Sequence, residues 1–291
     1  MLIYLNGKFV DEAEACVSVF DHGVLYGDGV FEGIRAYNGR VFKLKEHINR
    51  FFEAMHAIDL KINMSKDDVM QVVVNTCKMN DLKDAYIRLV ATRGKGDLGL
   101  APSNCPAPSL FCIASKIKLY DAEMYEKGLA LMTSSKRRNS PSMLDPQIKS
   151  LNYLNNILAK IEASKFGYQE ALMLDGNGCV CECTGDNIFI VKNGELYTPP
   201  TYLGILDGIT RRSVIEVAKN LNIKVNEVPF TLFNVYNADE CFLTGTAAEL
   251  IPVTELDKRK IAQGKVGALT LKLLGEFKKY VLKEENGEII K

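Results

Sequence analysis

Histidines, apolar stretches and secretion signals are scarce or missing in this sequence. Only three histidines occur, His22, His47 and His56, and none lies in a nucleophile motif such as GxSxG. No apolar stretch approaches the ~18 residues that span a bilayer. The first residues, MLIYLNGKFVDEAEA, lack a basic segment followed by a long apolar run. We therefore expect a cytoplasmic protein that has no membrane as partner.

An excess of charge of either sign is missing as well. Lys plus Arg and Asp plus Glu number 36 each, so the formal net charge is zero. Such a chain gives no electrostatic reason to expect nucleic acid as a partner. A content of 47% hydrophobic and 25% charged residues is typical of a soluble globular protein. At 291 residues, the length favours two domains over one.

Metal-binding cysteine pairs are also absent from the sequence. None of the eight cysteines belongs to a CxxC motif that is followed by a second CxxC or by HxxxH. We expect reduced thiols in a core rather than disulfides or a structural metal site.

The elements that are present alternate between strands and helices. Asn38-Gly39 between apolar runs at 30–37 and 40–44 predicts a hairpin. Apolar residues recur every three or four positions over 45–58 and predict a helix. Arg50 lies off most of that apolar stripe, so periodicity alone favours a solvated arginine. Ser65 followed by acids predicts another helix start.

Further along, the pattern predicts strands at 85–94 and 109–118, a Gly- and Pro-rich loop at 94–108, and a connector at 119–128. The second half contains a strand at 129–135 and a helix at about 151–166 with Leu154, Ile157, Leu158 and Ile161 on one side. Short strands follow over 170–199, then a helix within 204–222, a strand, turn and strand over 238–253, and a closing helix at 265–285. The pattern indicates an α+β or α/β protein.

Four motifs could carry chemistry. Lys149 lies at a loop-to-helix junction and is either a solvated charge or a Schiff-base lysine. GITRR at 208–212 begins a helix, where backbone N–H groups could hold phosphate or Thr210 could simply be a cap. TGTAAE at 244–249 is a small-residue turn that an anion could approach, or a plain β-turn. CVCECTGDNIF at 179–189 is a strand pattern, which should place Cys179, Cys181 and Cys183 on one face and Glu182 on the other.

The order of these motifs, Lys149, Glu182 in ECTGDN, GITR and TGTAAELIPV, resembles fold-type IV pyridoxal-phosphate enzymes. With YGDGVFEGIR at 26–35 and RRNSPSMLDPQIKSLNYLNNILAKIEA at 137–163, the chain is similar to branched-chain-amino-acid aminotransferases over nearly its whole length. The resemblance implies a two-domain fold like that of D-amino-acid aminotransferase. A smaller N-terminal α/β domain would span 1–119, a connector 120–128, and a larger C-terminal domain with a β-barrel-like core 129–291.

The resemblance also implies how the cofactor, pyridoxal 5′-phosphate, is held. Lys149 would form the Schiff base and then act as acid and base. Glu182 would keep the pyridine nitrogen protonated, and Tyr153 would bind the phenolic oxygen. Arg50 would bind the phosphate, which reverses the interpretation from periodicity. The same resemblance assigns a ring contact to Leu206 and phosphate contacts to Ile209, Thr210 and Thr246.

For the substrates, the resemblance implies a pocket in the first domain. Tyr26, Phe31 and Tyr86 would line it for an aliphatic side chain. Arg88 would receive the distal carboxylate of glutamate, and the Thr246-Ala247 backbone with Tyr86 would bind the α-carboxylate. The expected reaction moves the amino group of leucine, isoleucine or valine to 2-oxoglutarate, and its partners are therefore small amino acids and 2-oxo acids.

Several alternatives stay open at this stage. D-amino-acid aminotransferases carry an Arg-Asn-His segment that the loop RGKGDLGLAP lacks, and aminodeoxychorismate lyases use the same cofactor for elimination. A cysteine-based metal or redox protein is a third possibility. Relatives have glycine where this chain has Cys183. They form homodimers or larger homo-oligomers, and the same is expected here.

Overall fold

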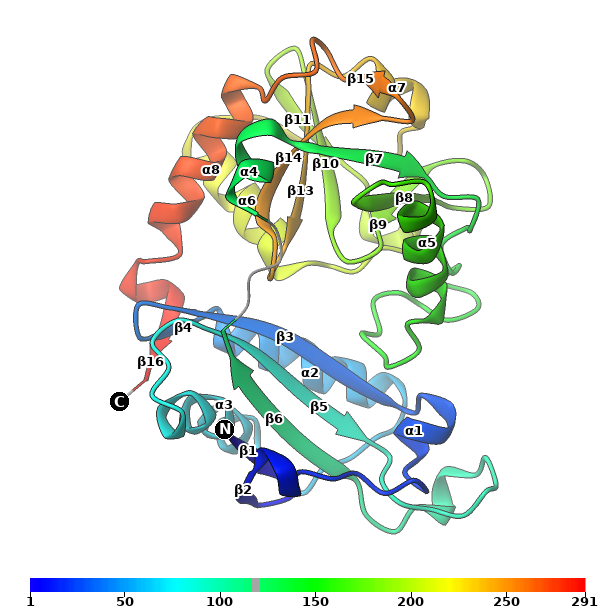
Figure 1. The fold of residues 1–291 in the computed structure, drawn as a ribbon, viewed down its shortest axis with the longest axis vertical. Helices are drawn as coiled ribbons and strands as arrows, with labels where there is room; N and C mark the ends of the chain where they lie inside the picture. The colour runs from blue at the N-terminus through cyan, green and yellow to red at the C-terminus, as the bar shows by residue number, and fades with distance from the viewer. Residues whose placement is uncertain (117–120, 291) are drawn as a thin grey trace. The chain divides into compact units, whose positions relative to one another are not determined.

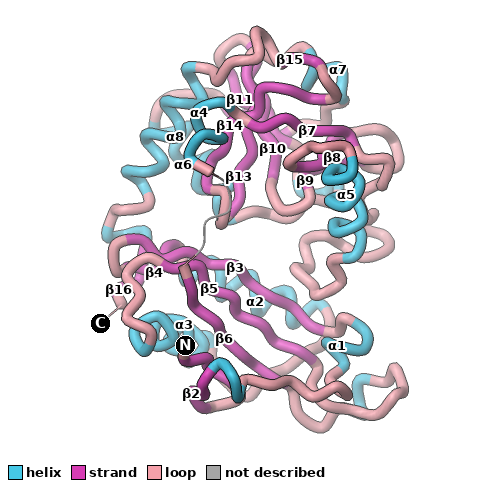
Figure 2. The backbone as a smooth tube through the Cα atoms, viewed as in Figure 1, coloured by secondary structure: helices cyan, strands magenta, loops and turns pink. Residues whose placement is uncertain are grey.

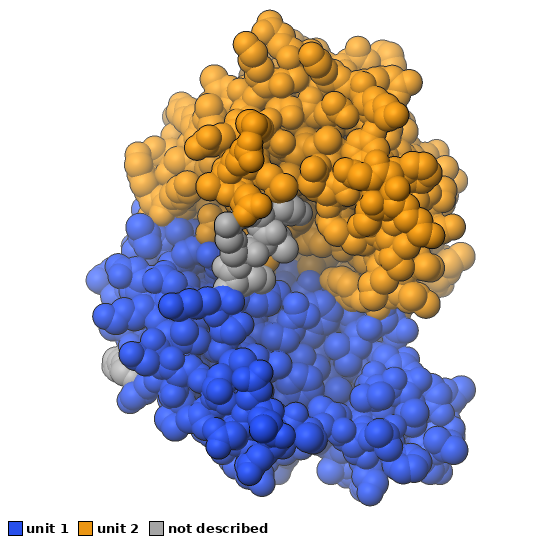
Figure 3. Space-filling view, in the orientation of Figure 1, with its two compact units in different colours: residues 1–117, 148–152, 281–291 blue, residues 118–147, 153–280 orange. Residues whose placement is uncertain are grey.

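A computed structural model describes residues 1–116 and 121–290. The chain divides into two compact units (Figure 3), which are described separately. Unit 1 comprises residues 1–117, 148–152 and 281–291, and unit 2 comprises 118–147 and 153–280. The units differ from the predicted ranges at three places. Residues 148–152 and 281–291 belong with the N-terminal part, and residues 121–128 of the predicted connector belong to unit 2. The predicted boundary at 119–120 lies outside the described residues.

Unit 1 is built on one seven-stranded sheet in the order β16-β4-β3-β5-β6-β1-β2 (Figure 1). Every neighbouring pair in this order is antiparallel. The strands are β1 (Leu2–Leu5), β2 (Lys8–Asp11), β3 (Gly29–Tyr37), β4 (Arg40–Phe42), β5 (Ala85–Thr92), β6 (Ser109–Ser115) and β16 (Gly287–Ile289). The predicted hairpin is confirmed, with Asn38 and Gly39 both at positive φ between β3 and β4.

Two helices pack on one face of this sheet. They are α2 (Leu44–Ala57) and α3 (Lys66–Met79), and both are predicted from the sequence. Ser65 caps α3 in a reciprocal capping box with Asp68. The stripe of α2 buries Ile48, Phe51 and Met55 in one core with β3, β5 and β6. A short helix, α1 (His22–Tyr26), precedes β3.

The strands of unit 2 are drawn in Figure 2, and their pairings form a closed barrel. Its wall runs β10-β13-β14-β7-β8-β9 and closes through a pairing of β9 with β10. The pairs β14–β7 and β7–β8 are parallel and the others antiparallel, so this is a mixed six-stranded barrel. The strands are β7 (Leu129–Thr133), β8 (Glu170–Leu174), β9 (Val180–Cys183), β10 (Asn187–Lys192), β13 (Glu240–Gly245) and β14 (Glu249–Leu256). Apolar residues from all six strands fill one interior cluster.

The predicted helices of this half are α5 (Leu154–Lys165), α6 (Ile209–Asn220) and α8 (Ala268–Tyr280). Among the described residues of unit 2, the other α-helices and strands are α4 (Ala122–Lys127), α7 (Leu232–Tyr236), β11 (Glu195–Thr198), β12 (Val225–Glu227) and β15 (Arg259–Lys260), and a 3-10 turn spans Thr201–Leu203. The closing helix ends at Tyr280, before the predicted 285, because the chain then returns to unit 1 as a 3-10 turn and β16.

The apolar side of α5 is exposed. Leu154, Ile157, Leu158 and Ile161 retain between 42% and 64% of their accessible surface. The buried side of α5 instead carries Asn156, Ala159 and Ala163. Small residues let the helix approach β8 closely, and the large apolar side chains remain on the outer side.

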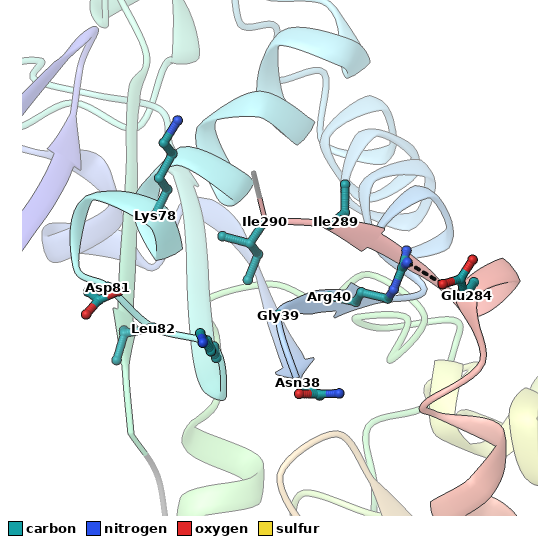
Figure 4. Close-up of a pocket in the computed structure, with 10 residues that line it drawn as sticks. Asn38, Gly39, Arg40, Lys78, Asp81, Leu82, Glu284, Ile289 and Ile290 are labelled. Carbon is teal, nitrogen blue, oxygen red and sulfur yellow. Dashed lines mark hydrogen bonds and ion pairs between the residues drawn. The ribbon is translucent and has the colours of Figure 1, made fainter.

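The C-terminal strand β16 pairs with β4 and borders a pocket of about 590 Å³ (Figure 4). Arg40 donates a hydrogen bond of 2.9 Å to Glu284 at one side of the pocket, and Lys78 and Leu82 line another. The pocket contains none of the predicted site residues. Within residues 1–116 and 121–290, no helix is both long and apolar enough to cross a membrane.

Candidate active site

Lys149 lies at the edge of β3 in unit 1. The N–H of Phe31 donates to the Lys149 carbonyl at 2.9 Å, and the N–H of Leu151 donates to Gly29 at 2.9 Å. Since β4 pairs only with Ala36 and Tyr37, the start of β3 has an open edge that residues 148–152 occupy. Lys149 Nζ lies 4.6 Å from the ring centroid of Phe31. The backbone of Lys149 is therefore fixed by its pairing with β3, and the residue is half-buried.

Arg50 is buried on the helix side of β3, with 6% of its surface accessible. Its Nε and Nη2 donate to the two carboxylate oxygens of Glu32 at 2.7 and 2.8 Å. His47, one turn earlier on α2, contacts the same carboxylate through Nδ1 at 2.7 Å. The solvated arginine favoured by periodicity is wrong, because the charge of Glu32 inside the core compensates that of Arg50.

The pKa values of Glu32 and His47 are both lowered in this cluster, by different causes. Burial alone would raise the pKa of Glu32, but Arg50 and His47 outweigh it and hold that pKa well below its ordinary value. Burial lowers the pKa of His47, against the attraction of Glu32, and the charge of Lys149 contributes to the same lowering. At neutral pH we infer an ionised Glu32 and a neutral His47 whose Nδ1–H is the donor.

The opposite face of the sheet brings three predicted substrate residues together. Arg88 stacks over Phe31 with 4.5 Å between its guanidinium carbon and the ring centroid. Its Nη2 donates to the Tyr86 hydroxyl at 3.0 Å. Because side chains alternate across a strand, Phe31 and Glu32 face opposite sides of β3, and Lys149 lies at the edge between them. Unit 1 thus groups the lysine with a wall formed by Phe31, Tyr86 and Arg88.

Tyr26 is the last residue of α1. Its hydroxyl donates to the carbonyl of Leu98, its ring meets that of His22 edge-on at 5.1 Å, and 36% of its surface is accessible. The structure therefore gives Tyr26 a place in an exposed segment of unit 1.

In unit 2, Glu182 is buried on the outer side of the barrel wall, next to the interior residue Cys183. Three donors hold its carboxylate: Arg138 Nε at 2.8 Å, the Leu206 N–H at 3.0 Å and Asn187 Nδ2 at 3.2 Å. Asn187 also donates to the Leu206 carbonyl at 2.9 Å, which ties the loop before α6 to the strand. These donors favour the ionised carboxylate.

The start of α6 has the geometry of an anion site. Its N-cap is Gly208, which provides no side-chain hydrogen bond, so the alternative in which Thr210 caps the helix is wrong. Ile209 and Thr210 are the first two helical residues, and both are buried. A Cβ at Gly208 would lie 2.1 Å from Asn187 Oδ1, so this position requires glycine. The macrodipole and the first-turn N–H groups favour negative charge here.

The other predicted residues of unit 2 occupy turns and helix starts. Thr246 and Ala247 lie in the turn between β13 and β14, and both are half-buried. Tyr153 is the half-buried N-cap residue of α5. The adjacent Ala248 carbonyl accepts a hydrogen bond of 2.9 Å from Tyr125, which helps to fix the turn.

Comparison with known proteins decides the family. Residues 29–256 match the amino-transferase class IV family. A relative from Methanocaldococcus jannaschii, provisionally named a branched-chain-amino-acid aminotransferase, is 55% identical over 278 residues, which is 96% of each chain. The chain belongs to the class IV aminotransferases.

Solved structures agree with this family at the level of the fold. The branched-chain amino acid aminotransferase of Escherichia coli matches with a TM-score of 0.97 and 34% identity, covering 100% of this chain and 99% of that one. The enzyme of the same name from Thermoproteus uzoniensis, solved with norvaline, matches with a TM-score of 0.94 and 38% identity, covering 100% and 99%. The two-domain fold-type IV architecture with a barrel in the C-terminal domain is thus confirmed.

The predicted cofactor is also confirmed by a solved relative. The branched-chain amino acid aminotransferase from Thermobaculum terrenum, described as the holo-form with pyridoxal phosphate, matches with a TM-score of 0.89 and 29% identity, covering 100% of this chain and 98% of that one.

Sequence reasoning missed four residues of this aminotransferase that hold predicted ones. Arg138 and Asn187 hold Glu182. Glu32 holds Arg50, and His47 in turn holds the carboxylate of Glu32. A signal existed for Glu32, since it occupies the buried register of the strand at 30–37, where its neighbours on that face are apolar. Arg138 gave no comparable signal, because its loop shows no periodicity.

Burial raises the pKa of the five buried thiols of the aminotransferase. Burial raises the pKa of Cys181 to about 12 and that of Cys183 well above its ordinary value. Among the described residues, no group of three His, Cys, Asp or Glu could hold a metal ion. The predicted strict alternation is wrong at one point: an extra residue in β9 opposite β8 turns both Val180 and Cys183 into the barrel interior.

Proposed function

We propose that this aminotransferase moves the amino group of leucine, isoleucine or valine to 2-oxoglutarate with pyridoxal 5′-phosphate as cofactor. The observation that carries the proposal is Lys149, fixed at the edge of β3 beside the apolar Phe31. The names of the relatives support the same substrate class.

The residues present fit this cofactor. Lys149 offers an amine for its aldehyde, and the donor set on Glu182 keeps a carboxylate ready for a protonated ring nitrogen. The start of α6, which has no side-chain cap, offers N–H groups to a phosphate. When bound, the cofactor supplies an aldehyde and an electron-withdrawing ring.

In this proposal Lys149 anchors the cofactor and then, displaced by the substrate amine, moves the proton of the substrate Cα. Its backbone pairing with β3 limits where that amine can reach, which lowers the entropic cost of the transfer. Glu182 holds the ring-nitrogen proton, and Leu206 packs on the ring. Tyr153, Arg50, Ile209, Thr210 and Thr246 complete the cofactor contacts.

Substrate choice would depend on the wall of Phe31, Tyr86 and Arg88. When it stacks on Phe31, Arg88 adds its apolar flank to a pocket for an aliphatic side chain. The same guanidinium can pair with the distal carboxylate of glutamate in the other half-reaction. The α-carboxylate would bind the Thr246-Ala247 backbone with Tyr86, and Tyr26 would complete the pocket.

We also propose that the protein is a homodimer or a larger homo-oligomer and is cytoplasmic. Exposed apolar residues support self-association, both on α5 and in the unit 1 segments that carry Val19, Val24, Leu98 and Leu100. All eight cysteines are unpaired and five of them are buried, which suits a reducing compartment.

The test is chemical and kinetic. The purified protein should be yellow, and borohydride should fix the cofactor covalently on Lys149. Lys149→Ala should abolish leucine-dependent turnover, because no other amine takes its place; substantial residual transamination would contradict the role. A colourless preparation that contains metal would overturn the proposal.

A panel of amino donors in both enantiomers, assayed with 2-oxoglutarate, tests the two competing functions. We expect turnover with L-leucine, L-isoleucine and L-valine. Preference for D-amino acids would indicate a D-amino-acid aminotransferase, and release of pyruvate from aminodeoxychorismate would indicate a lyase.

A further inference from the structure

A charged cluster in the core of unit 1 needs a functional explanation. Glu32 has no accessible surface, and it lies among apolar residues of β3 that pack on α2. A buried ion pair is often no more stabilising than apolar residues of similar volume, so its presence is weak evidence for a stabilising role. The cluster adjoins the segment of Lys149, because Phe31, next to Glu32, pairs with Lys149.

The geometry of the cluster fixes the orientation of one guanidinium. Arg50 presents its Nε and Nη2 side to Glu32, with both oxygens of the carboxylate engaged. His47 holds the carboxylate from a second direction, at 2.7 Å. A planar guanidinium held along one side cannot rotate, and its Nη1 must then point away from Glu32.

We propose that Glu32 and His47 are positioning residues for the cofactor phosphate, which act by setting the direction in which Arg50 presents its Nη1. The inference rests on the proposed function, in which Arg50 binds that phosphate. Glu32 reduces the positive charge of the cluster, so an attraction of charge alone would be stronger without it. Glu32 instead orients the guanidinium of Arg50. Because the carboxylate engages Nε and Nη2, Arg50 can approach the phosphate only with its Nη1 side.

The readout is the discrimination between pyridoxal phosphate and pyridoxal. Both carry the aldehyde that Lys149 needs, and only the first carries phosphate. Absorbance measures the binding of each ligand. The dissociation constant of pyridoxal divided by that of pyridoxal phosphate reports the contribution of the phosphate contacts alone. Glu32→Gln keeps the size of the side chain but loses the bidentate carboxylate, and we expect it to reduce this ratio about tenfold or more, which corresponds to about 1.4 kcal/mol.

Two controls separate positioning from a general structural effect. Glu53→Gln makes the same change at an exposed site of the same helix and should leave the ratio unchanged. In an Arg50→Lys background, where a single ammonium replaces the fork, Glu32→Gln should change the ratio little. An equal loss of both ligands in Glu32→Gln, or an undiminished effect in the Lys background, would overturn the proposal.

A milder variant covers the case in which Glu32→Gln does not fold. His47→Gln removes one support of the carboxylate and should reduce the ratio about threefold, with a shifted phosphorus resonance of the bound cofactor. His56→Gln, exposed on the same helix, is its control. An unchanged ratio and resonance would refute the positioning role. A wild-type protein that binds neither ligand would instead refute the proposed function itself.

Discussion

Arg138 lies at 2.8 Å from Glu182 and also reaches the side-chain oxygens of Asn155 and Asn156, at 3.1 and 3.3 Å. The guanidinium therefore ties the barrel strand β9 to α5 through one buried carboxylate. A carboxylate that loses its cationic partner in such a place is costly, about 3–5 kcal/mol for a fully buried pair. At the scale of single residues, the proposed role of Glu182 thus depends on an arginine that no motif identifies.

Arg138→Gln should lower kcat/KM for leucine by about tenfold or more, because an unsupported Glu182 stabilises the ring-nitrogen proton less and each ~1.4 kcal/mol is a factor of ten. Steady-state kinetics with leucine and 2-oxoglutarate measure this. Arg137→Gln, at an exposed neighbouring position, is the control. Wild-type kinetics in Arg138→Gln would show that the contact is dispensable.

Substitution of Arg88 should separate the two substrates. Arg88→Ala should raise KM for glutamate and 2-oxoglutarate about tenfold or more, while leucine loses only the apolar flank of the side chain. Half-reactions with each substrate, followed by the absorbance of the cofactor, give the two effects. Equal losses for leucine and glutamate would argue against a shared pocket with one arginine.

At the scale of elements, the start of α6 depends on glycine. A Cβ at Gly208 would meet Asn187, whose amide bonds both Glu182 and the carbonyl before the helix. A displacement of Asn187 would therefore disturb the helix start, the loop before it and the carboxylate of Glu182 at once. Through Asn187, a substitution at Gly208 can therefore affect the chemistry of Glu182.

Gly208→Ala should destabilise the protein by about 1–3 kcal/mol through overpacking and should lower activity as well. Gly275→Ala in α8 is the matched control, since a Cβ there meets nothing within 4 Å and the position is exposed. We expect that variant to be more stable than wild type, by about 0.5–1 kcal/mol. Denaturant unfolding of both variants tests the opposite signs, and equal effects would contradict the steric argument.

At the scale of the whole molecule, large apolar residues are exposed on α5 and in segments of unit 1. The exposed side of α5 joins four large apolar residues in one row. A contiguous row of this kind supports the proposed self-association, whereas single scattered apolar residues would need no explanation.

Ile157→Asp should shift the proposed dimer toward monomer, because a charge in an apolar interface is desolvated without a partner. Analytical ultracentrifugation over a range of concentrations measures the shift. Lys165→Glu is the control, because it changes an exposed residue of the same helix that is already charged. This variant should associate as the wild-type protein does. An unchanged oligomer in Ile157→Asp would exclude α5 from the interface.

The cluster in unit 1 also makes stability depend on pH. His47 has a pKa below its ordinary 6.5, so the unfolded state binds more protons as pH falls below 6.5, and the free energy of unfolding declines. Glu32 adds a second decline below its ordinary 4.5, because its pKa is also lowered in the folded state. Urea unfolding from pH 8 to 3 should show the first decline below pH 6.5 and the onset of the second below pH 4.5. His47→Gln should remove the first one, and the same slope in this variant and in His56→Gln would contradict the assignment.

The sequence by itself determined the local structure and the chemical inventory. The Asn38-Gly39 turn, the helix over α2 and the capped start of α3 depend on neighbours in the chain, so propensity and periodicity suffice for them. The order of Lys149, Glu182 and the two small-residue turns similarly indicated the family.

Only the tertiary structure decided which groups support these residues. The partner of Arg50 comes from β3 and that of Glu182 from a loop 44 residues earlier, and no local pattern encodes such distant pairings. The large apolar residues of α5 face outward because Ala159 and Ala163 permit close packing on the inner side. Hydrophobicity alone would predict the opposite orientation of this helix. Burial and hydrogen bonding over long sequence separations decide these features, since an ionised side chain enters a core only where its partner is already placed.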